Sequence, residues 1–313
     1  MVGQPLITIL GAGKVGMATA VMLMMRGYDD LLLIARTPGK PQGEALDLAH
    51  AAAELGVDIR ISGSNSYEDM RGSDIVLVTA GIGRKPGMTR EQLLEANANT
   101  MADLAEKIKA YAKDAIVVIT TNPVDAMTYV MYKKTGFPRE RVIGFSGILD
   151  SARMAYYISQ KLGVSFKSVN AIVLGMHGQK MFPVPRLSSV GGVPLEHLMS
   201  KEEIEEVVSE TVNAGAKITE LRGYSSNYGP AAGLVLTVEA IKRDSKRIYP
   251  YSLYLQGEYG YNDVVAEVPA VIGKSGIERI IELPLTEDEK KKFDEAVQAV
   301  KKLVETLPPQ LRE

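Results

Sequence analysis

The sequence contains 313 residues, with 36 basic and 38 acidic side chains, three histidines and no cysteine. The absence of cysteine excludes a disulfide framework, a thiol nucleophile and a cysteine-ligated zinc site, and we expect no bound metal. The near balance of charge disfavours nucleic acid as a partner. No apolar run reaches the ~18 to 20 residues of a membrane span, and the N-terminus lacks the basic start of a signal peptide, so we expect a cytoplasmic protein without membrane contact.

The first half of the chain alternates short apolar strands with helices. Strands that are apolar on both faces and alternate with helices form parallel sheets, because parallel strands need long crossover connections. We therefore predict a doubly wound α/β domain over residues 1–146. Its expected strands are residues 6–10, 31–35, 59–61, 75–79 and 115–120, and its expected helices are 17–25, 44–55 and 91–111.

The pattern changes after about Ser146, where regular strand and helix alternation stops. Alternating apolar residues predict antiparallel strands, so we assign residues 147–313 to an α+β domain. Thr286 and Glu289 form a capping box that opens a charged C-terminal helix, and the residues after Pro308 are expected to be loose. The other elements expected here are helices at 149–162, 201–221 and 231–243 and strands at 169–174, 249–255 and 264–272.

A glycine-rich turn, Gly-Ala-Gly-Lys-Val-Gly, stands between the first strand and the first helix. In such a turn the first glycine allows a tight bend, the second admits a pyrophosphate to the backbone, and the third lets helix and strand pack closely. The alternative is a plain glycine-rich turn. Its position favours a Rossmann dinucleotide-binding domain, in which the contacting residues are Gly11, Ala12, Gly13, Lys14, Val15 and Gly16.

The end of the second strand indicates which dinucleotide is bound. An Asp or Glu there would accept hydrogen bonds from the ribose hydroxyls of NAD, but the sequence reads Ala35-Arg36-Thr37. Since no carboxylate repels a 2′-phosphate and Arg36 offers a fork of donors, we predict that Arg36 and Thr37 favour NADP. The alternative is a solvated Arg36 beside a pocket that accepts either NADP or NAD.

A histidine is the best candidate for proton transfer, because its ordinary pKa lies near neutrality. His50 lies within a predicted helix and His197 within a charged segment. His177 follows a buried strand and has a glycine on each side of the Met176-His177 pair, which leaves room for a ligand. We predict that His177 is catalytic, with a structural role as the alternative.

Five motifs occur in the order of a known family. They are Gly-Ala-Gly-Lys-Val-Gly at 11–16, Gly-Arg-Lys-Pro-Gly-Met-Thr-Arg at 83–90, Thr-Asn-Pro-Val-Asp at 121–125, Leu-Asp-Ser-Ala-Arg at 149–153 and Gly-Met-His-Gly at 175–178. Over essentially its whole length the chain resembles the lactate/malate dehydrogenase superfamily. It is most similar to the malate dehydrogenases that look like lactate dehydrogenase.

The resemblance implies a catalytic or substrate-binding role for residues of four of these motifs. His177 would protonate the substrate oxygen as hydride arrives, and Asp150 would orient its imidazole. Arg153 would bind the carboxylate beside the reacting carbon, Arg90 would polarise the reacting carbonyl, and Asn122 would hydrogen-bond the substrate oxygen. The alternative for Asp150 and Arg153 is an ordinary i,i+3 helix pair.

By this resemblance, Arg84 is the residue that distinguishes a malate-type from a lactate-type substrate. A lactate-type enzyme resembling this chain would carry Gln there, whereas a second arginine beside Arg153 suits a dicarboxylate, so the implied reaction interconverts oxaloacetate and malate. The alternatives are a solvated basic loop tip and, for the protein, a lactate or other 2-hydroxy-acid dehydrogenase. A non-catalytic dinucleotide-binding sensor is an alternative of another class.

The resemblance also implies an oligomeric state and further cofactor contacts, and the chain differs from the family pattern at two places. Family members form homotetramers or homodimers, so we expect one of these here. The chain departs from the commoner family pattern at Ala35-Arg36, which puts strict NAD dependence in doubt, and at Gln179-Lys180, which affects the substrate-pocket wall. The implied further cofactor contacts are Ala80, Gly81, Asn97, Thr120, Thr121 and Asn122.

Overall fold

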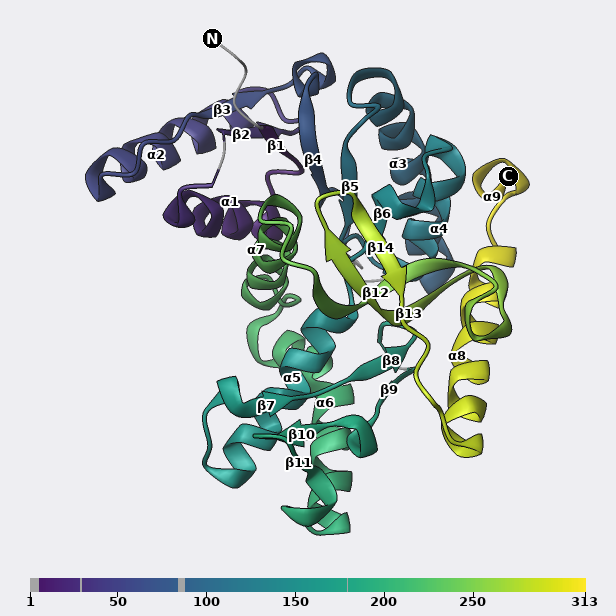
Figure 1. The fold of residues 1–313 in the computed structure, drawn as a ribbon. Helices are drawn as coiled ribbons and strands as arrows, with labels where there is room; N and C mark the ends of the chain where they lie inside the picture. Colours follow the sequence, from purple (N-terminus) through teal and green to yellow (C-terminus); the bar gives the residue numbers. More distant parts are fainter. Residues whose placement is uncertain (1–5, 29, 84–87, 179) are drawn as a thin grey trace.

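The computed structural model describes residues 6–28, 30–83, 88–178 and 180–313 (Figure 1). The strands of its first half pair in parallel in the order β3-β2-β1-β4-β5-β6. This order reverses between β1 and β4, as in dinucleotide-binding sheets. The strands are β1 (Leu6–Leu10), β2 (Asp30–Ile34), β3 (Ile61–Ser64), β4 (Ser73–Val78), β5 (Ile116–Ile119) and β6 (Val142–Gly144).

Helices cover both faces of this parallel sheet. They are α1 (Lys14–Arg26), α2 (Lys40–Leu55), α3 (Arg90–Tyr111) and α4 (Val124–Thr135), joined by α7 (Tyr228–Lys242) from the second half. Figure 1 shows α1, α2 and α7 together on one side of the sheet and α3 and α4 on the other. The predicted Rossmann arrangement is confirmed, and its inner strands are mostly buried because helices pack on both of their faces, whereas the edge strand β3 is partly exposed.

The second half is antiparallel and continues the same sheet. Beyond β6 the strand order runs through β12, β13, β8 and β9, with β14 paired to β13, and a small separate sheet has the order β11-β10-β7. The predicted α+β half is therefore confirmed. Its strands are β7 (Val169–Asn170), β8 (Val173–Gly175), β9 (Met181–Pro183), β10 (Ser189–Val190), β11 (Val193–Pro194), β12 (Arg247–Gln256), β13 (Asn262–Gly273) and β14 (Gly276–Ile280).

The remaining helices surround these strands. The capping box of Thr286 and Glu289 opens α8, as predicted. The expectation that the chain is loose after Pro308 is wrong, because α9 follows and buries Leu311 in the core. These helices are α5 (Gly147–Leu162), α6 (Lys201–Arg222), α8 (Glu287–Glu305) and α9 (Pro309–Arg312).

Several elements differ from the sequence-based expectation, three of them near the site. Helix α4 was not predicted, because nine of its 12 residues are buried and no amphipathic period marks it. The short strand β6 was missed as well. The strand expected over 169–174 is two strands, β7 and β8, which belong to different sheets.

The two halves share one hydrophobic core. Its largest cluster of buried side chains runs from Ile7 on β1 to Leu311 on α9. The sheet crosses from one half to the other where Ser252 on β12 pairs with Gly144 on β6. A boundary between residues 146 and 147 falls between β6 and α5 and stays a prediction.

Within the described ranges, no helix combines the length and the apolar character that crossing a membrane requires.

Candidate active site

The glycine-rich turn has the geometry that its sequence predicts. Gly11 has φ +117°, and a Cβ on Gly16 would lie 2.0 Å from the Gly11 carbonyl oxygen, so both positions need glycine. A Cβ on Gly13 would meet no described atom within 4 Å, which leaves its backbone accessible. Helix α1 begins at Lys14 with no side chain of the described chain capping it, so its first N–H groups can receive a phosphate.

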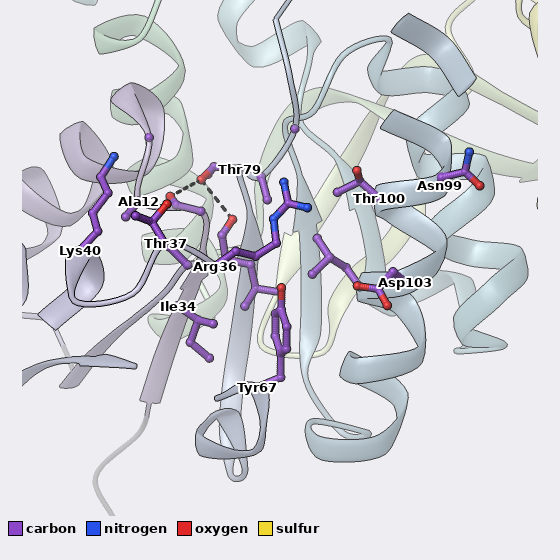
Figure 2. A pocket seen from close by; sticks show the side chains of 17 residues that line it. Ala12, Ile34, Arg36, Thr37, Lys40, Tyr67, Thr79, Asn99, Thr100 and Asp103 are labelled. Atoms are coloured by element: carbon purple, nitrogen blue, oxygen red, sulfur yellow. Dashed lines mark hydrogen bonds between the residues drawn. The ribbon is translucent and has the colours of Figure 1, made fainter. Parts of the chain in front are cut away.

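A cavity of about 500 Å³ lies at this turn, at the carboxyl ends of β1 and β2 (Figure 2). In Figure 2, the Arg36 side chain extends into the middle of the side chains that line the cavity, between Thr79 and the α3 residue Thr100. Asp103 faces it from the same helix, and no carboxylate stands at the end of β2. The lining residues are Leu10, Gly11, Ala12, Gly13, Ile34, Ala35, Arg36, Thr37, Lys40, Tyr67, Thr79, Ala80, Gly81, Asn99, Thr100, Asp103 and Leu104.

The sequence interpretation missed one wall of this cavity. Asn99, Thr100 and Asp103 lie on one face of α3, at spacings that place them within one turn. Most of the polar residues of α3 are exposed, so no local sequence signal distinguishes these three from the rest. Their wall ends at the same edge of the sheet as Arg36, which explains how residues far apart in the sequence enclose one site.

Asn97 holds two loops together at the edge of this site. Its amide nitrogen donates to the carbonyl oxygens of Asn122 at 2.8 Å and Ile82 at 3.1 Å, and its Oδ1 accepts from the Ile82 N–H at 2.9 Å. Thr121 donates to the Ala80 carbonyl oxygen at 2.6 Å. Asn97 is not among the described residues that line either cavity of the site, so its visible role is to position the loop backbones.

A second cavity, of about 370 Å³, lies where the two halves meet. The first half supplies Val15, Thr120 and Asn122, and the second half supplies Arg153 and His177. The structure thus brings four predicted catalytic and cofactor motifs to one space. The complete lining is Val15, Thr120, Asn122, Phe145, Leu149, Arg153, His177, Gly178, Met181, Val212, Gly215, Ala216, Thr219, Ser225, Ser226 and Pro230.

His177 and Asp150 form a hydrogen-bonded pair beside this cavity. The His177 Nδ1 lies 2.6 Å from an Asp150 carboxylate oxygen, and the Asp150 side chain is fully buried. Burial alone would lower the pKa of His177, but the Asp150 carboxylate, assisted by Asp125, outweighs burial and raises that pKa above its ordinary value. Because Nδ1 is engaged by Asp150, Nε2 is the ring nitrogen left for proton exchange in the cavity.

Arg153 completes the constellation. Its guanidinium donates to Asp150 at 2.9 Å and to Ser226 at 3.4 Å, and its side chain is only 14 % exposed. Its Nε is buried and has no hydrogen-bond partner in the described part of the chain. A buried donor without a partner is costly, so this nitrogen suits a ligand that brings its own acceptor, as a carboxylate does.

Asp125 is a site residue that the sequence interpretation missed. Its carboxylate accepts the backbone N–H of His177 at 3.1 Å and the Ser252 hydroxyl at 2.7 Å. Burial raises the pKa of Asp125 to about 6, although both donors oppose that shift. The Thr-Asn-Pro-Val-Asp motif contained this residue, but only the fold shows that it supports the loop carrying His177.

The other predicted positions do not join this cluster. Arg90 is exposed at the start of α3 and is not among the described residues that line the cavity. Lys14 stacks on Tyr224, with its Nζ 3.0 Å from the ring centroid. His50 and His197 are exposed. Arg84 and Gln179 lie outside the described residues.

A dinucleotide cavity beside a histidine–aspartate pair and a mostly buried arginine defines a nicotinamide-dependent oxidoreductase. The family models of lactate/malate dehydrogenase match the chain, the NAD binding domain over residues 6–144 and the alpha/beta C-terminal domain over residues 148–308. The chain belongs to the lactate/malate dehydrogenase family.

Individual relatives agree with this assignment. A malate dehydrogenase from Aeropyrum pernix is 99 % identical over 308 residues, covering 98 % of this chain and 100 % of that protein. One from Pyrobaculum aerophilum is 58 % identical, covering 97 % of this chain and 99 % of its own. The solved structure of the malate dehydrogenase from Aeropyrum pernix matches with a TM-score of 0.96 and 99 % identity, covering 98 % of this chain and 100 % of that one.

Proposed function

We propose that this protein is a malate dehydrogenase that transfers a hydride reversibly between NADP(H) and the oxaloacetate/malate pair, with His177 as general acid and base. The observation that carries the proposal is the shared cavity of His177 and Arg153, both of which touch the buried Asp150. A proton-transfer group and a carboxylate-binding group thus face the same space, which is what a 2-hydroxy acid requires. The relatives named malate dehydrogenase support the choice of substrate.

The residues of the chain supply binding and proton transfer, and the nicotinamide dinucleotide supplies or accepts the hydride when bound. Arg153 receives the substrate carboxylate on its unpartnered Nε. The Asn122 Oδ1 accepts the Val124 N–H at 3.3 Å, which leaves its amide N–H groups for the substrate oxygen. In the direction of reduction His177 donates its Nε2 proton to that oxygen, while Asp150 stabilises the imidazolium beforehand.

Arg84 and Arg90 remain the proposed dicarboxylate and carbonyl contacts. Arg84 lies outside the described residues, so its role rests on the family motif at 83–90.

Initial rates measured with oxaloacetate and pyruvate, each with NADPH and NADH, test the whole proposal. We expect oxaloacetate to exceed pyruvate by about 10-fold to 100-fold or more in kcat/KM, because pyruvate has no second carboxylate to pair with Arg84. Faster turnover of pyruvate would make the protein a lactate-type enzyme instead.

The preference for NADP rests on the first cavity. Arg36 reaches into it and Lys40 lines it, and Ala35 stands where a ribose-binding carboxylate would repel the 2′-phosphate. Asp103 on the opposite wall is the group that opposes this preference, and NAD remains the alternative cofactor.

The double variant Ala35→Asp with Arg36→Ile tests this preference. We expect the ratio of kcat/KM for NADPH over NADH to fall by about 10-fold to 100-fold, since a new acceptor for the 2′-hydroxyl replaces a phosphate partner. The matched control is Arg26→Ile, a change of the same kind at the end of α1. A ratio that is unchanged in the double variant would assign the choice to other residues of the cavity, such as Thr37 or Lys40.

We also propose a cytoplasmic homotetramer or homodimer with domains at residues 1–146 and 147–313. Met25, Leu46 and Leu55 on α1 and α2 are 62 %, 59 % and 59 % exposed, which supports an apolar face for a second copy of the chain.

A further inference from the structure

Buried polar groups almost encircle His177. On one side its backbone N–H donates to Asp125, which the Ser252 hydroxyl contacts at 2.7 Å. Ser252 in turn lies 2.9 Å from the Ser146 hydroxyl, at the start of α5. On the other side the imidazole contacts Asp150 at 2.6 Å. These groups come from α4, β12 and the start of α5, and among the described residues the chain of side-chain contacts is open between Ser146 and Asp150.

Glu267 occupies that opening. It lies on β13, opposite Gly175, and its side chain is fully buried. Single oxygen or nitrogen atoms of Glu267, Asp150 and His177 all lie within 4.8 Å of one another. Neither carboxyl oxygen of Glu267 has a hydrogen-bond partner among the described residues. A buried polar group in that condition is rare and requires an explanation.

The backbone leaves room for this carboxyl group. A Cβ on Gly147 would lie 2.5 Å from the Cβ of Pro250 and 2.8 Å from the Cδ and an Oε of Glu267, so glycine at the start of α5 leaves the space that Pro250 and Glu267 occupy. The polar side chains that face Glu267 are Asp150 and Ser146. The carboxyl group is thus enclosed in the catalytic cluster, although it does not line the substrate cavity.

The charges around Glu267 fix its protonation state. Asp150 on α5 and Asp125 on α4 place negative charge near it, and the positive groups His177 and Arg153 are already engaged by Asp150. Burial, then the charge of Asp150 and then that of Asp125 raise the pKa of Glu267 well above its ordinary value. A neutral carboxylic acid is the form that keeps three carboxyl groups this close together.

We propose that Glu267 is a positioning residue of the acid/base site: it stays protonated and donates its proton to Asp150, closing the ring of buried polar groups around His177. The inference rests on the proposed role of His177. Asp150 is the stronger acceptor of the two groups that face Glu267, because it is a carboxylate. One carboxyl oxygen of Glu267 lies within 4.8 Å of one of Asp150. A side-chain rotation or one bridging water can close that separation.

The proposed hydrogen bond affects His177 through Asp150. A donor on Asp150 withdraws electron density from the carboxylate, so Asp150 attracts the imidazole proton less strongly. Glu267 would therefore limit the rise in the pKa of His177 and hold Asp150 in one orientation. An ionised Glu267 would do the opposite, since its negative charge would raise that pKa further.

Titration of the His177 ring by NMR in Glu267→Gln and Glu267→Leu tests the proposal. Three histidines make the assignment direct, with a His177→Asn sample as reference. Gln is neutral and keeps a donor, so we expect the pKa of His177 to stay within about 0.3 of wild type. Leu has no donor, and we expect an upward shift of about 0.5 to 1. A downward shift in the Gln variant, or no shift in the Leu variant, would overturn the proposal.

A second measurement does not depend on the Leu variant folding. At pH 8, above the pKa of about 6 that burial gives Asp125, infrared spectroscopy should show the carbonyl band of a protonated carboxylic acid in wild type. The band should disappear in Glu267→Gln and persist in Thr237→Val, a control that removes a buried hydroxyl from α7. A wild-type spectrum without the band would refute a neutral Glu267. Neither measurement requires turnover, so failure of the proposed function would appear separately, in the initial rates.

Discussion

Replacement of His177 by asparagine is expected to lower kcat for oxaloacetate reduction by about 10²-fold to 10⁴-fold, the usual contribution of a positioned general acid. Asparagine keeps a polar side chain of similar size but cannot deliver a proton. The Asp150 carboxylate would lose its imidazole partner and retain Arg153 at 2.9 Å, so the site keeps its carboxylate-binding group. We therefore expect the loss in kcat, with little change in binding of the dinucleotide, whose cavity does not contain His177.

The role of His177 as general acid and base also predicts how the wild-type rates depend on pH. Reduction needs the protonated imidazole, so kcat/KM for oxaloacetate should fall as the pH rises through the pKa of His177, which Asp150 raises above its ordinary value. Malate oxidation needs the neutral imidazole and should rise over the same interval. His197→Asn, at an exposed histidine, is the matched control and should keep both rates. Full activity of His177→Asn would exclude His177 as the acid.

Arg153→Met should reduce kcat/KM for oxaloacetate by about 10²-fold to 10⁴-fold. Two charge-assisted hydrogen bonds to a carboxylate are worth about 1.5–3 kcal/mol each when buried, and methionine fills the space without replacing them. Arg153→Lys keeps the charge but not the planar fork, so its rate should lie between methionine and wild type. Steady-state kinetics on the three proteins measure this order.

The chain contains a close control for that change. Arg71 and Glu68 form another i,i+3 pair, at 3.0 Å, but their side chains are 59 % and 61 % exposed, against 14 % and 0 % for Arg153 and Asp150. An exposed pair of this kind is worth only about 0.2–0.5 kcal/mol, so Arg71→Met should leave kcat/KM unchanged. If Arg153→Met and Arg71→Met lowered kcat/KM equally, the Arg153–Asp150 pair would be an ordinary helix contact without a role in substrate binding.

Local patterns were sufficient to predict the parallel sheet and the glycine-rich turn. Both depend on residues close in sequence: apolar runs for the strands, and Gly11 and Gly16 for the turn. His177 was predicted from its flanking glycines and its place after a strand. The pairing of His177 with Asp150 came from family resemblance, and the structure places the two groups in contact.

The remainder of the site depends on contacts between distant residues. Glu267 lies in an apolar strand with no neighbouring motif, and nothing local reveals that β13 brings it beside Asp150. The same is true of Ser252, which reaches Asp125 only because β12 packs against α4. Helix α4 was missed for a related reason: a helix buried on nearly every side loses the period by which amphipathic helices are identified.

The sheet that crosses from β6 to β12 has a consequence for how the molecule unfolds. A fragment ending at residue 146 would expose the edge of β6, and one starting at residue 147 would expose the edge of β12. Unpaired edges of this kind recruit other chains. Since both halves also contribute side chains to one core, they should lose structure together in a single cooperative transition, and neither should persist as an independent unit.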